Sequence, residues 1–407
     1  MLSRIAAWVA PSTHARELRP LDAVRGVAAF LVFVFHMENP TRYAYFSDAS
    51  VLGESLRSFV RHGYLWVDMF LVLSGFILAS KYHGLQVGKG FAWRAYIDFI
   101  VKRFARVYPL YITVTLVVLA LQPADTGPHW WPDRFDPPLG IVLPNVLLVQ
   151  AWGLAPSVVA PGWSLSAEYA VYLAFPIVTM LLLARGRAAA VAASVSVMAV
   201  VGFLWWTTRL QDSPYDVHDF FESRTLLRAF SGFGLGVLAW RVDAARVLHA
   251  LSPGPRSAAT AASILLVALT MARDGQELLT LPAFAFLLVG LSAGGPLTQR
   301  ILNAPIFFTL GYLSYSVYLI HDELHSLHDL LERTGGRFLA DKPAHLLALG
   351  LTLAAGYTLA ALAYRFVEEP ARRAVLRRWR GRQAQGKTPP RHRQTVLDRA
   401  VGAPTEP

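Results

Sequence analysis

The chain has 407 residues, of which 54% are hydrophobic and only 16% are charged, and its formal net charge is +11. Several apolar runs approach the roughly 20 residues that a helix needs to cross a bilayer, and the alternating pattern of a membrane β-barrel is absent. We therefore expect an all-α, polytopic membrane protein. The absence of cysteine excludes disulfides, thiolate metal ligands and a cysteine nucleophile.

Ten membrane spans are predicted in chain order. They fall near residues 21–38, 64–80, 104–122, 169–184, 188–207, 225–241, 257–272, 278–294, 306–321 and 344–366. Between the third and fourth spans, residues 139–168 hold a shorter apolar stretch and a Pro161-Gly162-Trp163 turn. Irregular backbone at membrane depth is tolerated only where it is buried in protein or lines a cavity. We predict that 139–168 form a re-entrant or interfacial segment on the outer side.

The basic residues gather in the segments on one side of these spans. An even number of spans puts both termini on that side, and the positive-inside rule then places both in the cytoplasm. We expect a short N-terminal segment (1–20), one transmembrane domain (21–370) and a disordered basic tail (371–407) that touches anionic lipid headgroups. This arrangement makes membrane lipid, and not nucleic acid, the partner of the positive charge.

Arg25 and His36 stand out because they lie within the first apolar run. An ionisable residue inside the membrane is a functional hypothesis by default. Eleven residues make about three helical turns, so both side chains project from one face, roughly 16 Å apart along the axis. With the first span running outward, Arg25 lies toward the cytoplasm. His36 lies toward the outer face, where an imidazole can act as a general base.

Three more polar residues are expected near the depth of His36. Asp68 is in the outer part of the second span, Glu168 opens the fourth, and His321 ends the ninth. A carboxylate from this group can orient the His36 imidazole. Each residue also has a structural interpretation: Asp68 as a helix cap or a structural pair, Glu168 as a charge favoured by a helix N-terminus, and His321 with Asp322 as interfacial groups.

Arg103 and Arg106 end the basic loop that precedes the third span. They are three residues apart and share a helix face, and the planar guanidinium group suits phosphate. The alternative is that they only enforce the positive-inside topology. The sequence shows no spacing typical of a metal site, and no metal is expected.

Five segments, in order along the chain, resemble the signatures of the acyltransferase 3 family. The first is Leu21-Asp-Ala-Val-Arg25-Gly followed by His36, and the second is Val67-Asp68-Met-Phe-Leu-Val-Leu-Ser-Gly-Phe76. The others are Arg103-Phe-Ala-Arg106 with Tyr108-Pro109, Trp163-Ser-Leu-Ser-Ala-Glu168-Tyr169, and Leu313-Ser-Tyr-Ser-Val-Tyr-Leu-Ile-His321. The chain departs from the family pattern at Trp66, Tyr169 and Asp322.

The resemblance implies an integral-membrane O-acyltransferase of the inner (plasma) membrane. It would move an acyl group, usually acetyl, from cytoplasmic acyl-CoA to a hydroxyl of a sugar in a surface polysaccharide or glycolipid. His36 would be the catalytic base, with Glu168 or Asp68 orienting it, and Arg25, Arg103 and Arg106 would bind the acyl-CoA. Direct transfer and an acyl-histidine intermediate fit the same residues. Two other functions stay open: acylation of a small molecule such as a macrolide, and a proton-coupled secondary transporter.

Overall fold

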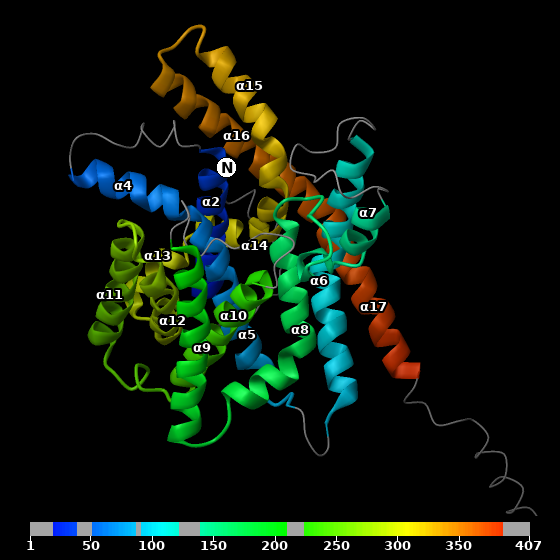
Figure 1. The fold of residues 1–407 in the computed structure, drawn as a ribbon, viewed down its shortest axis with the longest axis vertical. Coiled ribbons are helices and arrows are strands. Elements are labelled where there is room, and N and C mark those ends of the chain that lie inside the picture. The colour runs from blue at the N-terminus through cyan, green and yellow to red at the C-terminus, as the bar shows by residue number, and fades with distance from the viewer. Residues whose placement is uncertain (1–18, 39–50, 87–90, 122–138, 210–223, 386–407) are drawn as a thin grey trace, which may run out of the picture.

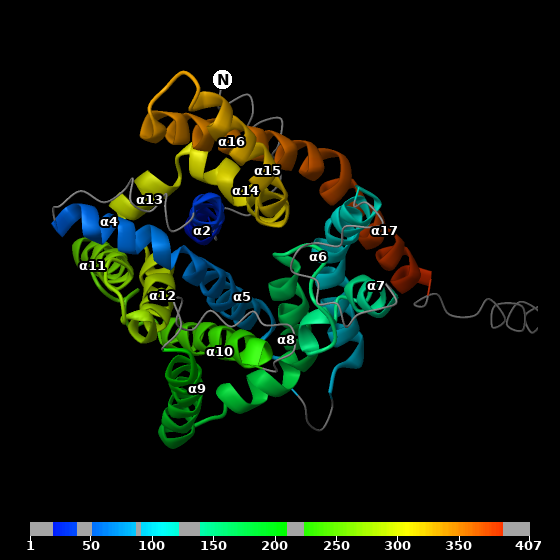
Figure 2. The same cartoon turned by 45° about the horizontal axis from the view of Figure 1, so that its top comes forward.

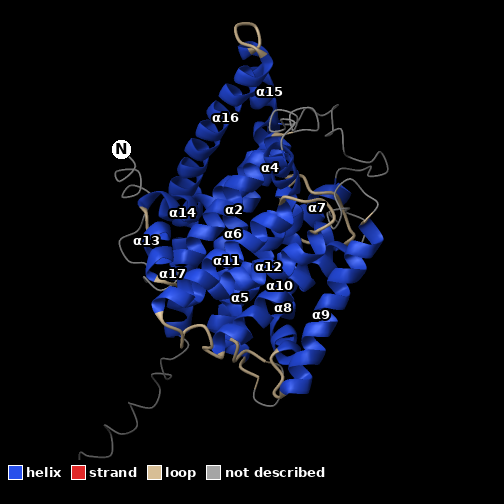
Figure 3. Cartoon of the chain, turned by 90° about the vertical axis from the view of Figure 1, so that its left-hand side faces the viewer, coloured by secondary structure: helices blue, strands red, loops and turns tan. Residues whose placement is uncertain are grey.

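The computed structural model describes residues 19–38, 51–86, 91–121, 139–209 and 224–385, and throughout these ranges it contains helices and no strand (Figures 1 and 3). The α-helices of the first half are α2 (Arg19–Met37), α4 (Val51–Arg61), α5 (Trp66–Tyr82), α6 (Trp93–Leu121), α7 (Leu139–Val146), α8 (Gly162–Leu182) and α9 (Arg187–Thr208). Those of the second half are α10 (Arg224–Ala244), α11 (Pro253–Met271), α12 (Glu277–Ala293), α13 (Pro296–Leu302), α14 (Pro305–Ile320), α15 (His325–Gly335), α16 (Asp341–Ala363) and α17 (Glu369–Gln385). Short 3-10 turns are η3 (His62–Leu65), η4 (Gln150–Trp152) and η5 (His321–Leu324), and η6 (Tyr364–Glu368) is a π-helix.

Six helical segments of the described chain are long and apolar enough to cross a membrane. They are Pro20–Met37, Gly53–Tyr82, Trp93–Leu121, Gly162–Leu182, Arg187–Thr208 and Asp341–Gln383. Each of the ten expected spans coincides with a helix, but α10, α11, α12 and α14 are not among these six. The all-helical, multi-pass architecture is therefore confirmed. The count of ten spans and the cytoplasmic placement of both termini stay predictions.

Helix α5 occupies the middle of the helical bundle (Figure 2) and contacts α2, α8, α10 and α12. Its crossing with α10 is possible only because both helices carry glycine there. A Cβ atom built on Gly75 would lie 2.1 Å from the Phe233 carbonyl oxygen, and one on Gly236 would lie 1.9 Å from the Val72 carbonyl oxygen. Small residues let backbones approach this closely in membrane helices.

Helix α6 begins about three turns before the span predicted at 104–122. Residues 93–103 were expected to be part of a basic cytoplasmic loop, but they extend the helix because one face of them is apolar. Phe99 is fully buried and stacks on Phe175 of α8, with ring centroids 5.0 Å apart. Beside this face Lys102 forms an ion pair with Asp98 at 2.6 Å. The longer helix places residues 103–106 in its interior.

Residues 139–161 turn back on themselves, because buried amide side chains satisfy their irregular backbone. The Asn145 side chain donates to the Pro156 carbonyl and accepts from the Val158 N–H, at 2.8 and 2.9 Å. Gln150 donates to the Gly162 carbonyl at 3.1 Å. Residues 162–168, expected to belong to this segment, form the first two turns of α8 instead. Glu168 therefore lies inside that helix and not at its start.

The C-terminal region also differs from the expected disordered tail of 371–407. Residues up to 385 form α17, which follows α16 through the π-helix η6. Helix α17 packs on α6, where Trp379 Nε1 donates to Asp98 Oδ1 at 2.9 Å. This contact with the folded domain explains why the basic stretch is ordered. Residues 386–407, like residues 1–18 of the N-terminal segment, lie outside the described residues.

The α5–α10 crossing generates a stability prediction. We expect Gly236→Ala to lower the stability of the purified protein by at least about 1–3 kcal/mol, because the new methyl group overlaps a backbone oxygen. Thermal unfolding in detergent measures the loss. Gly202→Ala on α9 is the matched control, since nothing lies within 4 Å of a Cβ atom there. Equal melting temperatures for the two variants would contradict the tight crossing.

Candidate functional site

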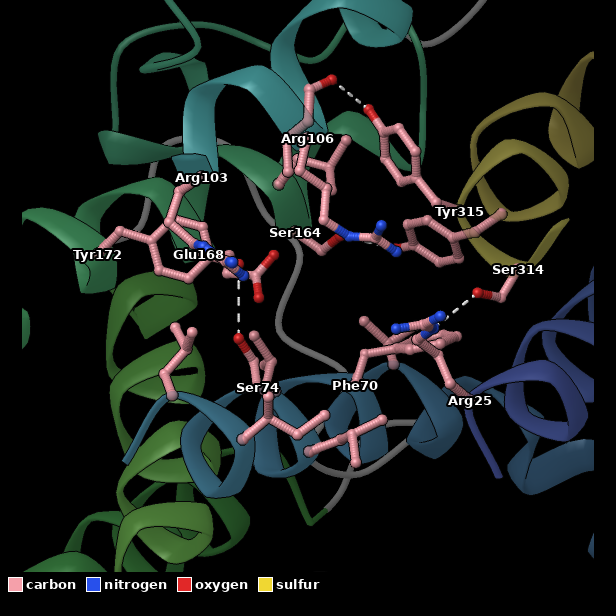
Figure 4. Close-up of a pocket in the computed structure, with 18 residues that line it drawn as sticks. Arg25, Phe70, Ser74, Arg103, Arg106, Ser164, Glu168, Tyr172, Ser314 and Tyr315 are labelled. Atoms are coloured by element: carbon pink, nitrogen blue, oxygen red, sulfur yellow. Dashed lines mark hydrogen bonds between the residues drawn. The ribbon is translucent and has the colours of Figure 1, made fainter. Parts of the chain in front are cut away.

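A cavity of about 150 Å³ lies where α2, α5, α6, α8 and α14 meet (Figure 4). Its walls include apolar side chains of α5 and hydroxyl groups from α8 and α14. The charged residues that line it, among those described, are Arg25, Arg103, Arg106 and Glu168. Pockets for drug-sized ligands measure roughly 300–1,000 Å³, so this cavity accommodates a narrow chain or a small group, and a larger ligand must extend beyond it.

Arg25 is held by α14 across a close helix contact. Its Nε donates to Ser314 Oγ at 2.9 Å, and its Nη2 donates to the Gly311 carbonyl at 2.8 Å. Nη2 also lies 3.1 Å from the Asp22 carboxylate one turn earlier. The neighbouring Gly26 makes this possible, because a Cβ atom there would lie 2.5 Å from the Gly311 nitrogen. The packing of α2 on α14 thus fixes the direction of the guanidinium group.

Arg103 and Arg106 reach the cavity from the opposite wall. Figure 4 shows their side chains and that of Glu168 directed into the same space as Arg25. Lys81, at the end of α5, interacts electrostatically with all three arginines. The sequence placed the arginine pair at the cytoplasmic mouth and Glu168 on the outer side, whereas the structure gathers them around one cavity. Its positive charges outnumber its carboxylate, so it suits an anionic ligand.

His36 and His321 lie together beyond the end of this cavity. Their ring centroids are 4.6 Å apart. His36 Nδ1 lies 2.9 Å from the Val32 carbonyl and His321 Nδ1 lies 2.7 Å from the Tyr318 carbonyl. If each Nδ1 carries the proton and donates it to that carbonyl, each Nε2 is the basic nitrogen. His321 is 1% exposed, and His36 is half-buried.

Tyr318 connects the two parts of the site. It lines the cavity, and its hydroxyl shares a hydrogen bond with Ser164 Oγ at 2.7 Å. Its ring centroid lies 5.8 Å from that of His321. Phe70, another cavity residue, packs edge-on against Tyr318 at 5.3 Å. Tyr318 therefore contacts both the cavity and His321, while neither histidine is among the residues that line the cavity.

Asp68 is placed elsewhere, in a buried ion pair with Arg228 of α10. Arg228 donates from Nε to Oδ1 at 3.0 Å and from Nη2 to Oδ2 at 2.8 Å, and both side chains are 0% exposed. The Arg228 guanidinium also lies 5.0 Å from the Trp163 ring centroid. The four residues expected near one depth (His36, Asp68, Glu168 and His321) thus lie at three separate sites. The two histidines form one, Glu168 lies with the cavity arginines, and Asp68 pairs with Arg228.

Two charged residues of this region were missed in the sequence. Arg228 is an arginine inside an otherwise apolar run, which is the same signal that identified Arg25. Glu368 belongs to the π-helix η6, is 2% exposed, accepts a hydrogen bond from Ser316 at 2.7 Å, and interacts electrostatically with Arg106. Single-turn π-helices occur often at functional sites, but their position is not readable from one sequence.

Comparison with known proteins places this geometry in context. A family model described as "Acyltransferase domain" matches residues 19–367. Acyltransferase MdmB of Streptomyces mycarofaciens is 32% identical over 170 residues, which are 40% of this chain and 39% of that relative. Protein 2 in picA locus of Rhizobium radiobacter is 31% identical over 164 residues, 37% of this chain and 76% of that relative. The chain thus covers well under half of MdmB, and no solved structure matches it.

The Asp68–Arg228 pair can be tested without an assay of function. Asp68→Asn leaves a buried arginine without its counter-charge, which costs about 3–5 kcal/mol, so we expect a large drop in the melting temperature. Replacing both residues, as Asp68→Leu with Arg228→Met, removes the unpaired charge and should recover most of the loss. A double variant as unstable as Asp68→Asn would show that Asp68 matters for another reason.

Proposed function

Because the chain belongs to the acyltransferase family whose model it matches, and is a multi-pass membrane enzyme, we propose that it moves an acyl group, acetyl in the first instance, from acyl-CoA to a hydroxyl of a sugar in a surface polysaccharide or glycolipid. The observation that carries this proposal is the cavity in which three arginines surround a narrow space. The inner (plasma) membrane, with both termini in the cytoplasm, is the proposed location.

The donor end of the reaction rests on the arginines. Coenzyme A carries several phosphates at one end of a long flexible arm, and its thioester is at the other. Arg103 and Arg106 bind the phosphates through charge-assisted hydrogen bonds, with Lys81 adding positive charge nearby. The flexible arm then extends past Arg25 inside the cavity. The cavity volume of about 150 Å³ fits a chain better than a nucleotide.

The histidine pair acts on the acceptor hydroxyl. His36 Nε2 takes the proton of the acceptor hydroxyl as its oxygen attacks the thioester carbonyl. The new C–O bond forms, the C–S bond breaks, and the proton passes from His36 to the departing thiolate, which leaves as coenzyme A. His321, in ring contact with His36, holds the imidazole in position. Each step uses side chains within the described helices.

The two predicted carboxylates receive different roles. Glu168 lines the donor cavity beside Arg103 (Figure 4), where it limits the net positive charge and favours release of the product. Asp68 acts through Arg228, which holds α5 against α10, and is therefore a positioning residue. A secondary transporter is no longer an alternative, because the family is one of acyltransferases.

The arginine pair gives the first functional prediction. We expect Arg103→Ala with Arg106→Ala to raise the KM for acyl-CoA more than it lowers kcat, since the lost phosphate contacts contribute to ground-state binding. Direct binding of acyl-CoA to detergent-purified protein should weaken in parallel. Arg94→Ala is the matched control, because Arg94 is an exposed arginine on the same helix. An effect on kcat alone would contradict phosphate binding.

His36 gives the second functional prediction. His36→Ala should lower kcat by about 10²–10⁴-fold, the usual contribution of a general base, while acyl-CoA binding and the melting temperature stay unchanged. Release of coenzyme A thiol from membranes supplied with envelope extract measures the rate. His83→Ala, an exposed histidine stacked on Trp240, is the control. Full activity of His36→Ala would show that His36 is not the base. With a labelled acyl donor, label recovered in a macrolide instead of a glycan would change the proposed acceptor.

A further inference from the structure

A second polar cluster lies away from the cavity, where the α15–α16 hairpin meets the end of α2 (Figures 1 and 3). His328 and Glu332 are one turn apart on α15, and His345 is near the start of α16, which packs on α15. Both histidine residues are 0% exposed. The Glu38 side chain, just after α2, is also 0% exposed. None of these residues lines the arginine cavity.

The three hairpin residues present ligand atoms to one point. One nitrogen or oxygen atom from each of His328, Glu332 and His345 lies within 4.8 Å of the other two. His345 Nδ1 is 3.3 Å from Glu332 Oε1, and the two imidazole rings stand at 88° with centroids 5.5 Å apart. Donor atoms of a tetrahedral zinc ion lie roughly 3.3 Å from one another. Small side-chain shifts therefore complete the geometry.

The opposite ring nitrogens are held by outer groups. His345 Nε2 lies 3.0 Å from Glu38 Oε1, and His328 Nδ1 lies 3.2 Å from Thr352 Oγ1. When each nitrogen donates its proton outward, His345 Nδ1 and His328 Nε2 are the lone-pair atoms on the side of Glu332. This is the second-shell arrangement that orients metal-binding histidines, in which a carboxylate or hydroxyl accepts the other N–H.

The charge of the surrounding carboxylates also favours a bound cation. Two carboxylates, Glu38 and Glu332, contact the ring of His345, and the Glu332 side chain is only 21% exposed. Glu38 Oε2 is buried and makes no hydrogen bond within the described part of the chain. Burying carboxylate charge without compensation is costly. A divalent cation between the two histidines and Glu332 compensates it.

We propose that His328, Glu332 and His345 bind a divalent transition metal, zinc by preference, with Glu38 orienting His345 and a water molecule as fourth ligand. Two imidazoles and a carboxylate are ligands that zinc accepts. The proposal departs from the sequence expectation of no metal; the signal overlooked there was a histidine and a glutamate four residues apart on one helix. The metal joins α15 to α16 and, through Glu38, to the end of α2 that carries His36.

Zinc analysis of the purified protein tests this directly. Protein carrying a tag without histidine is stripped with chelator, incubated with zinc chloride, desalted and analysed for metal. We expect one zinc per chain for the wild type and its loss in His345→Ala and in Glu332→Gln, whose near-identical shape preserves the fold. Glu38→Gln should bind zinc about 10–100-fold more weakly. Zinc should also raise the melting temperature of the wild type but not of Glu332→Gln.

His249→Ala is the matched control, since His249 forms a separate pair with Asp243 and should leave zinc binding intact. Folded wild-type protein with far less than one zinc per chain would overturn the proposal, leaving His345 as an imidazolium between two carboxylates. Zinc retained by Glu332→Gln but lost by His321→Ala would also overturn it. That result would assign the metal to His36, His321 and Asp322, whose ligand atoms also lie within 4.8 Å of one another.

Discussion

A charge placed in an apolar helix must find its compensation inside the protein, because hydrocarbon supplies neither water nor counter-ions. Asp68 and Arg228 satisfy each other completely, and both are 0% exposed. Arg25 is compensated by Asp22 and by two oxygen atoms of α14. The remaining arginines of the cavity face a single lining carboxylate, Glu168. The helix arrangement thus pairs Asp68 with Arg228 completely, while more arginines than carboxylates line the cavity.

Backbone contacts between helices determine where these charges point. Gly75 and Gly236 bring α5 and α10 together, and Gly26 does the same for α2 and α14. Without the glycines the helices would move apart by the width of a methyl group, and the hydrogen bonds from Arg25 to α14 would be lost. A site built from five helices therefore depends on residues that carry no chemistry of their own.

Hydropathy and helical period predicted the parts of the structure that depend on local sequence. Every expected span coincides with a helix, and Arg25 and His36 both face the segment of α14 and η5, as their spacing indicates. The sequence could not reveal that Arg228, 160 residues away, is the partner of Asp68. It also misplaced the start of α6, because the buried face of residues 93–103 depends on packing against α8. The assignment of roles within the site stays a set of predictions.

The π-helix between α16 and α17 constrains how the chain can evolve. A π-turn contains one residue more than an α-turn, and each residue of an α-helix rotates the chain by about 100°. Deleting one residue from 364–368 would therefore turn α17 by roughly that angle, carrying Trp379 away from Asp98 and Glu368 away from Ser316. Homologous chains should accordingly vary in side chains here but not in length.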